Sequence, residues 1–466
     1  MNIMTPKTLP SSQYQFPPNA FHVQKVTAAL FIENKRAYCL NDLGTGKTRS
    51  VLFAYDALRQ TGIAKKMLVI CPLSGMSRTW LREVRLFFPH LSAIILHGVK
   101  HRRVMRLSLD ADIYIINHDG VNVIFDELMK RENINVVCVD EIAGYRNGRA
   151  ARTKTLRALV KEREYVWGLT GSPIPKAVTD VWGPCSCLTP STVPKYFIVF
   201  RDQLMIKKDL FRWEPKPHAE ERAVACMQPS VRFRLDDVTE LPPRVTNYYD
   251  APLSSQQSGI YDAMRQAALA LVGTDKIDAL NAGAVLSKLL QIAIGYVYTR
   301  EGKTVALDNT PRLQLILDLV DAARQKVILF APFKSAVAGF STMLHTNSID
   351  HAVVTGDTPT KQRDVIFTAF QDTTQYKVLL AHPACMAHSL TLTSASTTIW
   401  GGPVTSLEIF QQANARMYRV GQKHRSLVAM IGGTAMERRI YKLLGANERL
   451  QNHFLSIVEA ITEEAQ

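Results

Sequence analysis

Short, almost purely apolar runs recur along the chain, separated by segments in which apolar residues follow helical spacing. A run without polar alternation predicts a strand buried on both faces, as in a parallel sheet covered by helices. These runs lie at residues 37–40, 67–70, 94–96, 113–116, 136–139, 165–169, 327–330, 352–354, 378–381, 398–400 and 428–431. Because they form two groups, the pattern predicts an α/β chain of two tandem, doubly wound parallel-sheet lobes.

The stretch between the two groups, residues 176–310, is less regular. Prolines interrupt its first part, and helical patterns return at 261–271 and 279–294. The sequence Leu-Pro-Pro-Arg at 241–244 is the predicted crossover into the second lobe. The expected domains are therefore residues 1–240 and 241–466.

A glycine-containing loop follows the first predicted strand and precedes a predicted helix. Residues 41–48 read Asn-Asp-Leu-Gly-Thr-Gly-Lys-Thr, and Asn41 stands where the strict phosphate-loop pattern has glycine. Gly44 and Gly46 allow backbone N–H groups to surround phosphate oxygens at the positive end of the helix dipole. Lys47 can reach the β- and γ-phosphates of ATP, and Thr48 can ligate Mg²⁺. The alternative is a turn that only caps a helix. The predicted ATP-binding residues of the loop are Asp42, Leu43, Gly44, Thr45, Gly46, Lys47 and Thr48.

Two adjacent carboxylates, Asp140 and Glu141, end the apolar run at 136–139. Ligands bind at the carboxyl ends of the strands in open α/β sheets. Asp140 suits the shell of a Mg²⁺ ion, usually through water, and Glu141 can orient and deprotonate an attacking water. A solvated acidic strand end is the alternative, which the preceding phosphate loop disfavours.

The composition is that of a globular chain with a basic surface. It has 47% apolar and 21% charged residues, and no apolar stretch approaches the length of a membrane span. No apolar signal segment is recognised near the N-terminus, so the expected location is cytoplasmic. The seven cysteines do not suggest a disulfide framework. The formal net charge of +15 favours a polyanionic partner such as nucleic acid.

Taken in order, the motifs resemble those of a Snf-type (Swi/Snf-like) ATPase of helicase superfamily two, in the compact form found in phages and bacteria. The resemblance covers roughly residues 16–450. It implies two RecA-like lobes with an ATP cleft between them, and it implies that Gln24 reads adenine. The segments that carry it are Gln24, residues 41–48, residues 71–74 with Trp80, residues 116–119, residues 140–147, residues 169–174 and residues 411–422.

The last of these segments contains two arginines that the resemblance assigns to catalysis. Gln412, Arg416 and Arg419 stand at i, i+4 and i+7, so one helix would present all three on one face. Arginines directed at the γ-phosphate across the cleft would act as arginine fingers. The alternative is a solvated arginine face on an amphipathic helix. Expected site residues are thus Arg416 and Arg419 for catalysis and Gln412 for nucleotide binding.

The chain departs from the family pattern at several positions. Ile142 and Ala143 replace the last two residues of the acidic box, which removes a histidine that often couples hydrolysis to the second lobe. Residues 382–392 occupy the place of motif V but lack most of its glycines, so the role of His388 is open between packing and a DNA phosphate contact. A tryptophan pair common in the family is also absent, with Val404 and Thr405 in its place.

The resemblance implies an ATP-dependent DNA translocase or helicase that uses ATP and Mg²⁺. Duplex DNA is the preferred track, with single-stranded or branched DNA as further candidates. The alternatives are a helicase that acts on branched DNA or RNA, and a nucleic-acid clamp without turnover. Candidate contacts to backbone phosphates, each equally compatible with a solvated surface, are Arg102, Arg103, Arg149, Arg152, Lys154, Lys207, Lys208 and Lys361.

Overall fold

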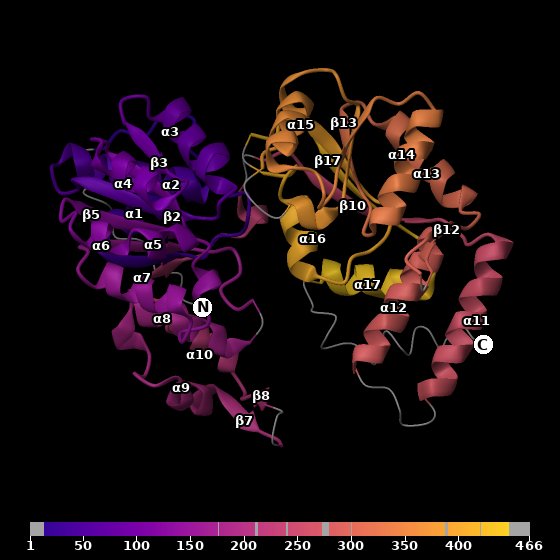
Figure 1. Ribbon diagram of the computed structural model, residues 1–466, viewed down its shortest axis with the longest axis horizontal. Helices are drawn as coiled ribbons and strands as arrows, with labels where there is room; N and C mark the ends of the chain where they lie inside the picture. Colours follow the sequence, from indigo (N-terminus) through magenta and orange to yellow (C-terminus); the bar gives the residue numbers. More distant parts are fainter. Residues whose placement is uncertain are drawn as a thin grey trace. The chain divides into compact units, whose positions relative to one another are not determined.

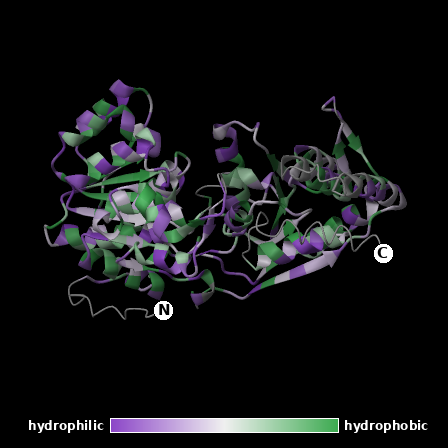
Figure 2. Ribbon diagram, turned by 90° about the horizontal axis from the view of Figure 1, so that it is seen from below, coloured by the Kyte–Doolittle hydropathy of each residue, from purple (hydrophilic) through white to green (hydrophobic). Residues whose placement is uncertain are grey.

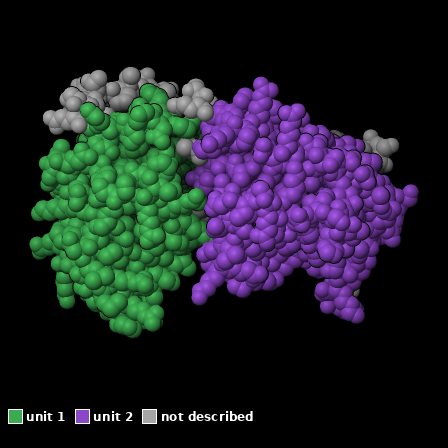
Figure 3. Space-filling view, turned by 90° about the horizontal axis from the view of Figure 1, so that it is seen from above, with its two compact units in different colours: residues 1–240 green, residues 241–466 purple. Residues whose placement is uncertain are grey.

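The computed structural model describes residues 14–175, 177–209, 213–238, 241–272, 279–299, 301–386, 390–419 and 421–446. The chain divides into two compact units, Met1–Glu240 and Leu241–Gln466, which Figure 3 shows in green and purple. Each apolar run identified in the sequence forms a strand. Within the described residues, no helix is long and apolar enough to cross a membrane.

The first unit is built on a 7-stranded sheet with strand order β3-β4-β2-β5-β6-β1-β9, in which all pairs are parallel. Alternate residues of a strand enter different cores: Tyr38 packs on one face of the sheet and Cys39 on the other. Figure 2 shows hydrophobic residues concentrated in these strands. The strands are β1 Arg36–Cys39, β2 Lys66–Cys71, β3 Ala93–Leu96, β4 Ile113–Asn117, β5 Ile134–Asp140, β6 Tyr165–Leu169 and β9 Ser230–Val231.

Helices cover both faces of this sheet, as the unbroken apolar strands require. Helices α1 (His22–Glu33), α2 (Lys47–Gln60) and α3 (Arg82–Phe87), with the π-helical turn Met76–Leu81, supply the core on one face. The remaining helices contribute to the core on the other face (Figure 1). They are α4 Lys100–Ser108, α5 His118–Val123, α6 Phe125–Met129, α7 Ala151–Lys161, α8 Trp182–Leu188, α9 Phe197–Leu204 and α10 Ala219–Ala225. An antiparallel ribbon joins β7 Met205–Lys207 to β8 Trp213–Pro215.

The second unit repeats this architecture with a 6-stranded parallel sheet in the order β10-β17-β16-β13-β15-β14. Its strands are β10 Arg244–Asp250, β13 Lys326–Phe330, β14 His351–Val354, β15 Val378–Ala381, β16 Ala395–Trp400 and β17 Ser426–Gly432. A short hairpin pairs β11 Tyr296–Tyr298 with β12 Thr304–Ala306. Two doubly wound parallel sheets confirm the predicted fold class of two RecA-like lobes.

Helices also cover both faces of the second sheet. Helices α13 (Thr310–Ala322) and α14 (Lys334–Thr346) pack on one face. Local sequence fixes several helix starts: proline opens α13, and the Thr434 hydroxyl caps α17 by accepting from the Glu437 N–H at 3.1 Å. The helices that build the core on the other face are α11 Ser255–Val272, α12 Ala279–Ile294, α15 Thr360–Asp372, α16 Leu407–Asn414 and α17 Ala435–Gly445.

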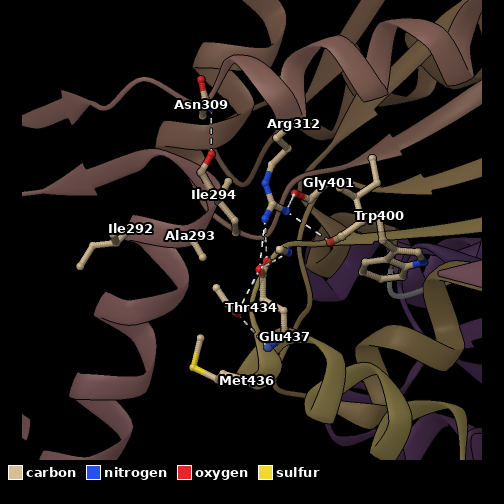
Figure 4. Close-up of polar contacts among 12 residues, drawn as sticks. Ile292, Ala293, Ile294, Asn309, Arg312, Trp400, Gly401, Thr434, Met436 and Glu437 are labelled. Carbon is tan, nitrogen blue, oxygen red and sulfur yellow. Dashed lines mark hydrogen bonds and ion pairs between the residues drawn. The ribbon is translucent and has the colours of Figure 1, made fainter. Parts of the chain in front are cut away.

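A buried ion pair between Arg312 and Glu437 lies at the carboxyl ends of β16 and β17 (Figure 4). Arg312 of α13 is 2% exposed and its Nη2 donates to both carboxylate oxygens of Glu437, at 2.9 and 3.1 Å. Its Nη1 donates to the carbonyl of Gly401 at 2.8 Å and to that of Ile431 at 3.3 Å. The Glu437 carboxylate also accepts from the Gly433 N–H at 2.8 Å. The guanidinium thus bonds to the carbonyls at the ends of both strands, and buried polar groups of this kind are normally hydrogen-bonded.

Removing one member of this pair should strongly destabilise the second lobe. We expect Arg312→Met to lower the free energy of unfolding by about 3–5 kcal/mol, because it strands the fully buried carboxylate of Glu437. Urea denaturation followed by circular dichroism measures the change. Lys334→Met, which removes an exposed ion pair with Asp357, is the control and should leave the unfolding midpoint nearly unchanged. An Arg312→Met variant that unfolds at the wild-type urea concentration would contradict this assignment.

Candidate ATP-binding site

The loop between β1 and α2 has the backbone of a phosphate-binding loop. Gly44 and Gly46 have positive φ angles of 88° and 85°, a conformation that favours glycine. Gly46 is the N-cap of α2, so the first N–H groups of that helix face the loop. A Cβ atom at Gly46 would lie 2.2 Å from Nε2 of Gln24, so a larger residue cannot fit there without displacing that side chain.

The Lys47 side chain folds over this loop. Its Nζ donates to the carbonyls of Asn41 at 2.8 Å and Asp42 at 3.1 Å. The Thr45 hydroxyl also donates to the Asp42 carbonyl, at 3.0 Å, and Thr48 is half-buried on the first turn of α2. The structure therefore brings the predicted loop residues together around one turn of backbone.

Gln24 lies against the loop from helix α1. Its side chain is 1% exposed, and its Oε1 accepts from the Phe21 N–H at 3.1 Å. Its Nε2 is buried and has no hydrogen-bond partner among the described residues. An amide donor buried in this way costs about 1–3 kcal/mol unless a ligand accepts from it.

The two predicted acids stand at the carboxyl edge of the same sheet. Asp140 is the last residue of β5, and its Oδ2 accepts from Nε1 of the buried Trp80 at 2.9 Å. Glu141 has a left-handed backbone, with φ 58° and ψ 52°. Such a conformation is uncommon and costly for a residue with a Cβ, and strained residues of this kind cluster at functional sites.

Thr170 joins the acid pair to β1. Its hydroxyl donates to Oε1 of Glu141 at 2.9 Å, and its N–H donates to the carbonyl of Cys39, the last residue of β1, at 3.0 Å. Since β5, β6 and β1 are neighbours in the sheet, the acid pair, Thr170 and the loop are at one edge.

The thiol of Cys39 lies beneath this edge. Burial raises its pKa to about 11, although the positive charge of Lys47 acts to lower the pKa, so this thiol stays protonated.

The phosphate loop is supported by a segment, at and after β9, that the sequence did not predict. The two-residue strand β9 pairs with β1, and the backbone beyond it bonds to the loop: the Asp42 N–H donates to the Phe233 carbonyl at 2.9 Å. The Asp42 carboxylate accepts from the Leu235 N–H at 3.2 Å. A strand of two residues is too short to show an apolar run, so the sequence pattern carried no signal for it.

In the second lobe, the prediction of one continuous helix from Gln412 to Arg419 is wrong. Helix α16 ends at Asn414, and both arginines lie in the turns that follow. After Asn414 the backbone continues as turns, in which the Arg416 N–H donates to the Ala413 carbonyl at 3.2 Å. The segment also bonds to residues outside the helix. The Trp400 Nε1 donates to the Asn414 side chain at 3.0 Å, and the Leu392 N–H donates to the Arg416 carbonyl at 3.0 Å.

Each arginine makes a contact with the main chain. Arg416 is 6% exposed, and its Nε donates to the Gln412 carbonyl at 2.9 Å. Arg419 is half-buried, and its Nη1 donates to the Leu390 carbonyl at 2.7 Å. The three predicted residues are therefore close along the chain, but they do not share a helix face.

The candidate phosphate contacts divide by exposure. Arg103 is wrong as a candidate, because it is 7% exposed and donates to the carbonyls of Leu96 at 2.8 Å and Gly98 at 2.7 Å. Arg152 is half-buried and donates to the Gly144 carbonyl. The exposed candidates are Arg102, Arg149, Lys154, Lys207, Lys208 and Lys361. His388 lies outside the described residues.

Metal-binding groups are sparse in the described part of the chain. No set of three or more His, Cys, Asp or Glu residues there is arranged to hold a metal ion, and all seven cysteines are free. Mg²⁺ needs no such cage, because it is usually bound through one or two carboxylates together with substrate phosphates. The hydroxyl of Thr48 and the carboxylate of Asp140 fit that requirement.

Comparison with known proteins identifies the family. Residues 34–294 match the SNF2-related domain. The chain belongs to the SNF2-related family of helicase-type ATPases. Residues 311–421 match the helicase conserved C-terminal domain, so a helicase-type domain is matched in the second unit as well.

Curated relatives are distant and mostly longer. The chain is 24% identical over 420 residues to the uncharacterized ATP-dependent helicase MG018 of Mycoplasma genitalium, covering 88% of this chain and 39% of that protein. It is 24% identical over 318 residues to protein p41 of Acyrthosiphon pisum secondary endosymbiont phage 1, covering 64% of this chain and 69% of p41. It is 23% identical over 456 residues to the DNA repair and recombination protein RDH54 of Saccharomyces cerevisiae, covering 85% of this chain and 49% of RDH54. The chain thus spans less than half the length of MG018 and RDH54.

Two solved structures of the SWI2/SNF2 ATPase core of Sulfolobus solfataricus are also similar to this chain. The core in complex with dsDNA is 20% identical with a TM-score of 0.44, covering 93% of each chain. The core domain alone is 22% identical with a TM-score of 0.45, covering 96% of this chain and 92% of the other.

Proposed function

We propose that this chain hydrolyses ATP under stimulation by nucleic acid and uses the energy to move along or remodel duplex DNA. The observation that carries the proposal is the convergence of Lys47, Asp140, Glu141 and Thr170 at one sheet edge, next to a loop with the backbone of a phosphate site. Both domains matched in the chain belong to helicase-type enzymes.

The first lobe holds the nucleotide in this proposal. Gly44 and Gly46 open the loop so that its N–H groups and the start of α2 bind the phosphates, while Lys47 exchanges its bonds to loop carbonyls for the β- and γ-phosphates. The unpartnered Nε2 of Gln24 donates to the adenine base. Thr48 and Asp140 hold Mg²⁺, which when bound neutralises charge on the phosphates.

The acid pair carries the hydrolytic step. Glu141 accepts a proton from the water that attacks the γ-phosphorus, the bond to the β-phosphate oxygen breaks, and ADP and inorganic phosphate form. Thr170 holds Oε1 of Glu141 at 2.9 Å and thereby fixes the direction of the base. Trp80 fixes Asp140 in the same way.

The second lobe supplies positive charge. Arg416 and Arg419 stabilise the charge that develops on the γ-phosphoryl group, and Gln412 assists nucleotide binding. Their present bonds to the Gln412 and Leu390 carbonyls hold the segment in a defined conformation. Exchange of the Arg419 bond for a phosphate contact would link ATP binding to the loop at residue 390.

Duplex DNA is the proposed track. The net charge is +15, and exposed lysines and arginines are available for backbone phosphates, which dominate sequence-independent binding. The relative RDH54 is named for DNA repair and recombination. Both lobes carry exposed candidates for these phosphate contacts. The first lobe has Arg102, Arg149 and Lys154, and the second has Lys361.

The test is ATP turnover by the full chain alone and with duplex DNA, single-stranded DNA or RNA added separately. We expect duplex DNA to raise kcat most, and the stimulation to fall steeply with added salt because counterions are released on binding. Greater stimulation by RNA or by branched DNA would favour a helicase on those substrates. Nucleic-acid binding without any turnover would favour the clamp and overturn the proposed activity.

A further inference from the structure

The amide of Asn41 occupies the position where strict phosphate loops have glycine, and it is almost completely buried, with 1% exposed. We propose that Asn41 is a positioning residue that holds the adenine-binding helix α1 in register with the phosphate loop, and so sets the preference for ATP over other nucleoside triphosphates. This inference rests on the proposed ATP-binding function.

The contact between Asn41 and α1 has a fixed direction. The Thr27 hydroxyl donates its single proton to the Val23 carbonyl at 2.7 Å, so its oxygen is left as an acceptor. Asn41 Nδ2 donates to that oxygen at 2.9 Å. Because the hydroxyl proton is engaged within the helix, only a side chain with a donor satisfies this position.

Thr27 stands three residues after Gln24 on the same helix, and side chains at this spacing share a face. The face of α1 therefore meets the phosphate loop at two points. Thr27 contacts Asn41 at the start of the loop, and Gln24 packs against Gly46 at its end. These two contacts lie about one helical turn apart, and they add directional restraints to the apolar packing of α1 in the core.

The other end of the same amide reaches the opposite side of the loop. Oδ1 of Asn41 accepts from the Phe233 N–H at 2.9 Å, and the Asn41 carbonyl accepts from Lys47. One side chain therefore joins α1, the loop and the segment after β9. Glycine at this position would make none of the side-chain contacts, so the departure from the strict pattern has a structural use.

The experiment measures the dissociation constants of fluorescent mant-ATP and mant-GTP for the full chain by titration, which does not require turnover. Asn41→Asp keeps an acceptor for Phe233 but removes the donor to Thr27. Thr27→Val removes the acceptor with little change of shape, and Thr27→Ser retains it. We expect Asn41→Asp and Thr27→Val each to weaken mant-ATP binding about 3- to 10-fold, the value of one net hydrogen bond, with a smaller change for mant-GTP.

Three comparisons make the result decisive. The double variant should be no weaker than the stronger single variant, because both changes break one contact. Thr27→Ser should bind as wild type does, and Gln24→Ala should lose the preference for ATP while leaving Asn41 in place. Equal weakening of mant-ATP and mant-GTP binding would show that Asn41 only supports the loop. The inference would also be overturned if the wild-type chain bound mant-ATP and mant-GTP with the same affinity. Failure of the proposed function is seen separately, as absence of ATP turnover by a wild-type chain that still prefers mant-ATP.

Discussion

Glu141→Gln is expected to lower ATP turnover by about 10²–10⁴-fold, the usual contribution of a general base. Glutamine has the shape of glutamate and can still accept the hydrogen bond from Thr170, so the left-handed turn at this position should persist. It cannot accept a proton from water at neutral pH. Two measurements test this: steady-state turnover with saturating DNA reports the loss of hydrolysis, and titration with mant-ATP reports whether ATP affinity is retained.

Glu164→Gln is a matched control for this experiment. It makes the same chemical change on an exposed glutamate of the first lobe that pairs with Lys35 at 3.0 Å, and it should leave turnover unaltered. Thr170→Val should cost less than Glu141→Gln, since it only releases the base from its fixed direction. A Glu141→Gln enzyme with wild-type turnover would remove the assignment of the base.

Arg416→Ala and Arg419→Ala should each preserve ATP binding and abolish most turnover. An arginine that stabilises the transition-state charge of phosphoryl transfer contributes about 10³–10⁵ in rate. Both variants also lose a bond to a main-chain carbonyl, to Gln412 or to Leu390. Turnover must therefore be compared with thermal unfolding of the same preparations.

Substitution of Arg416 or Arg419 by lysine separates the effect of the positive charge from the effect of the lost bond to a main-chain carbonyl. Lysine retains the charge but not the planar fork of donors, so Arg419→Lys should recover only part of the lost rate. Arg438→Ala, which removes an exposed pair with Asp250 in the same lobe, should have no effect on turnover. If neither arginine variant loses turnover, the second lobe does not supply the catalytic charge.

Most of the fold was predictable because strands in parallel sheets are buried on both faces. Such strands appear in the sequence as unbroken apolar runs, and each run found there forms a strand. Strand β10 escaped prediction because Arg244–Asp250 is a largely exposed strand at the edge of its sheet with few apolar residues. Strand β9 has only two residues, too few to form a pattern.

The candidate site was predictable where chemistry depends on local sequence. The loop at residues 41–48 and the acid pair follow directly after strands, so their place at the sheet edge follows from topology. The segment around Arg416 was misjudged because the helix ends where the chain bonds to Trp400 and Leu392, contacts that the local sequence does not reveal. Arg103 was misjudged for a related reason: charge in a sequence does not reveal whether backbone carbonyls have captured the side chain.

The segment after β9 that supports the phosphate loop determines when the nucleotide site can be completed during synthesis. Asn41 and Phe233 are 192 residues apart in the chain, yet their hydrogen bond helps to complete the nucleotide site. During synthesis the loop and α2 emerge early, but their support emerges only with the last segment of the lobe. A growing chain therefore carries an unfinished nucleotide site until nearly the whole first lobe has left the ribosome.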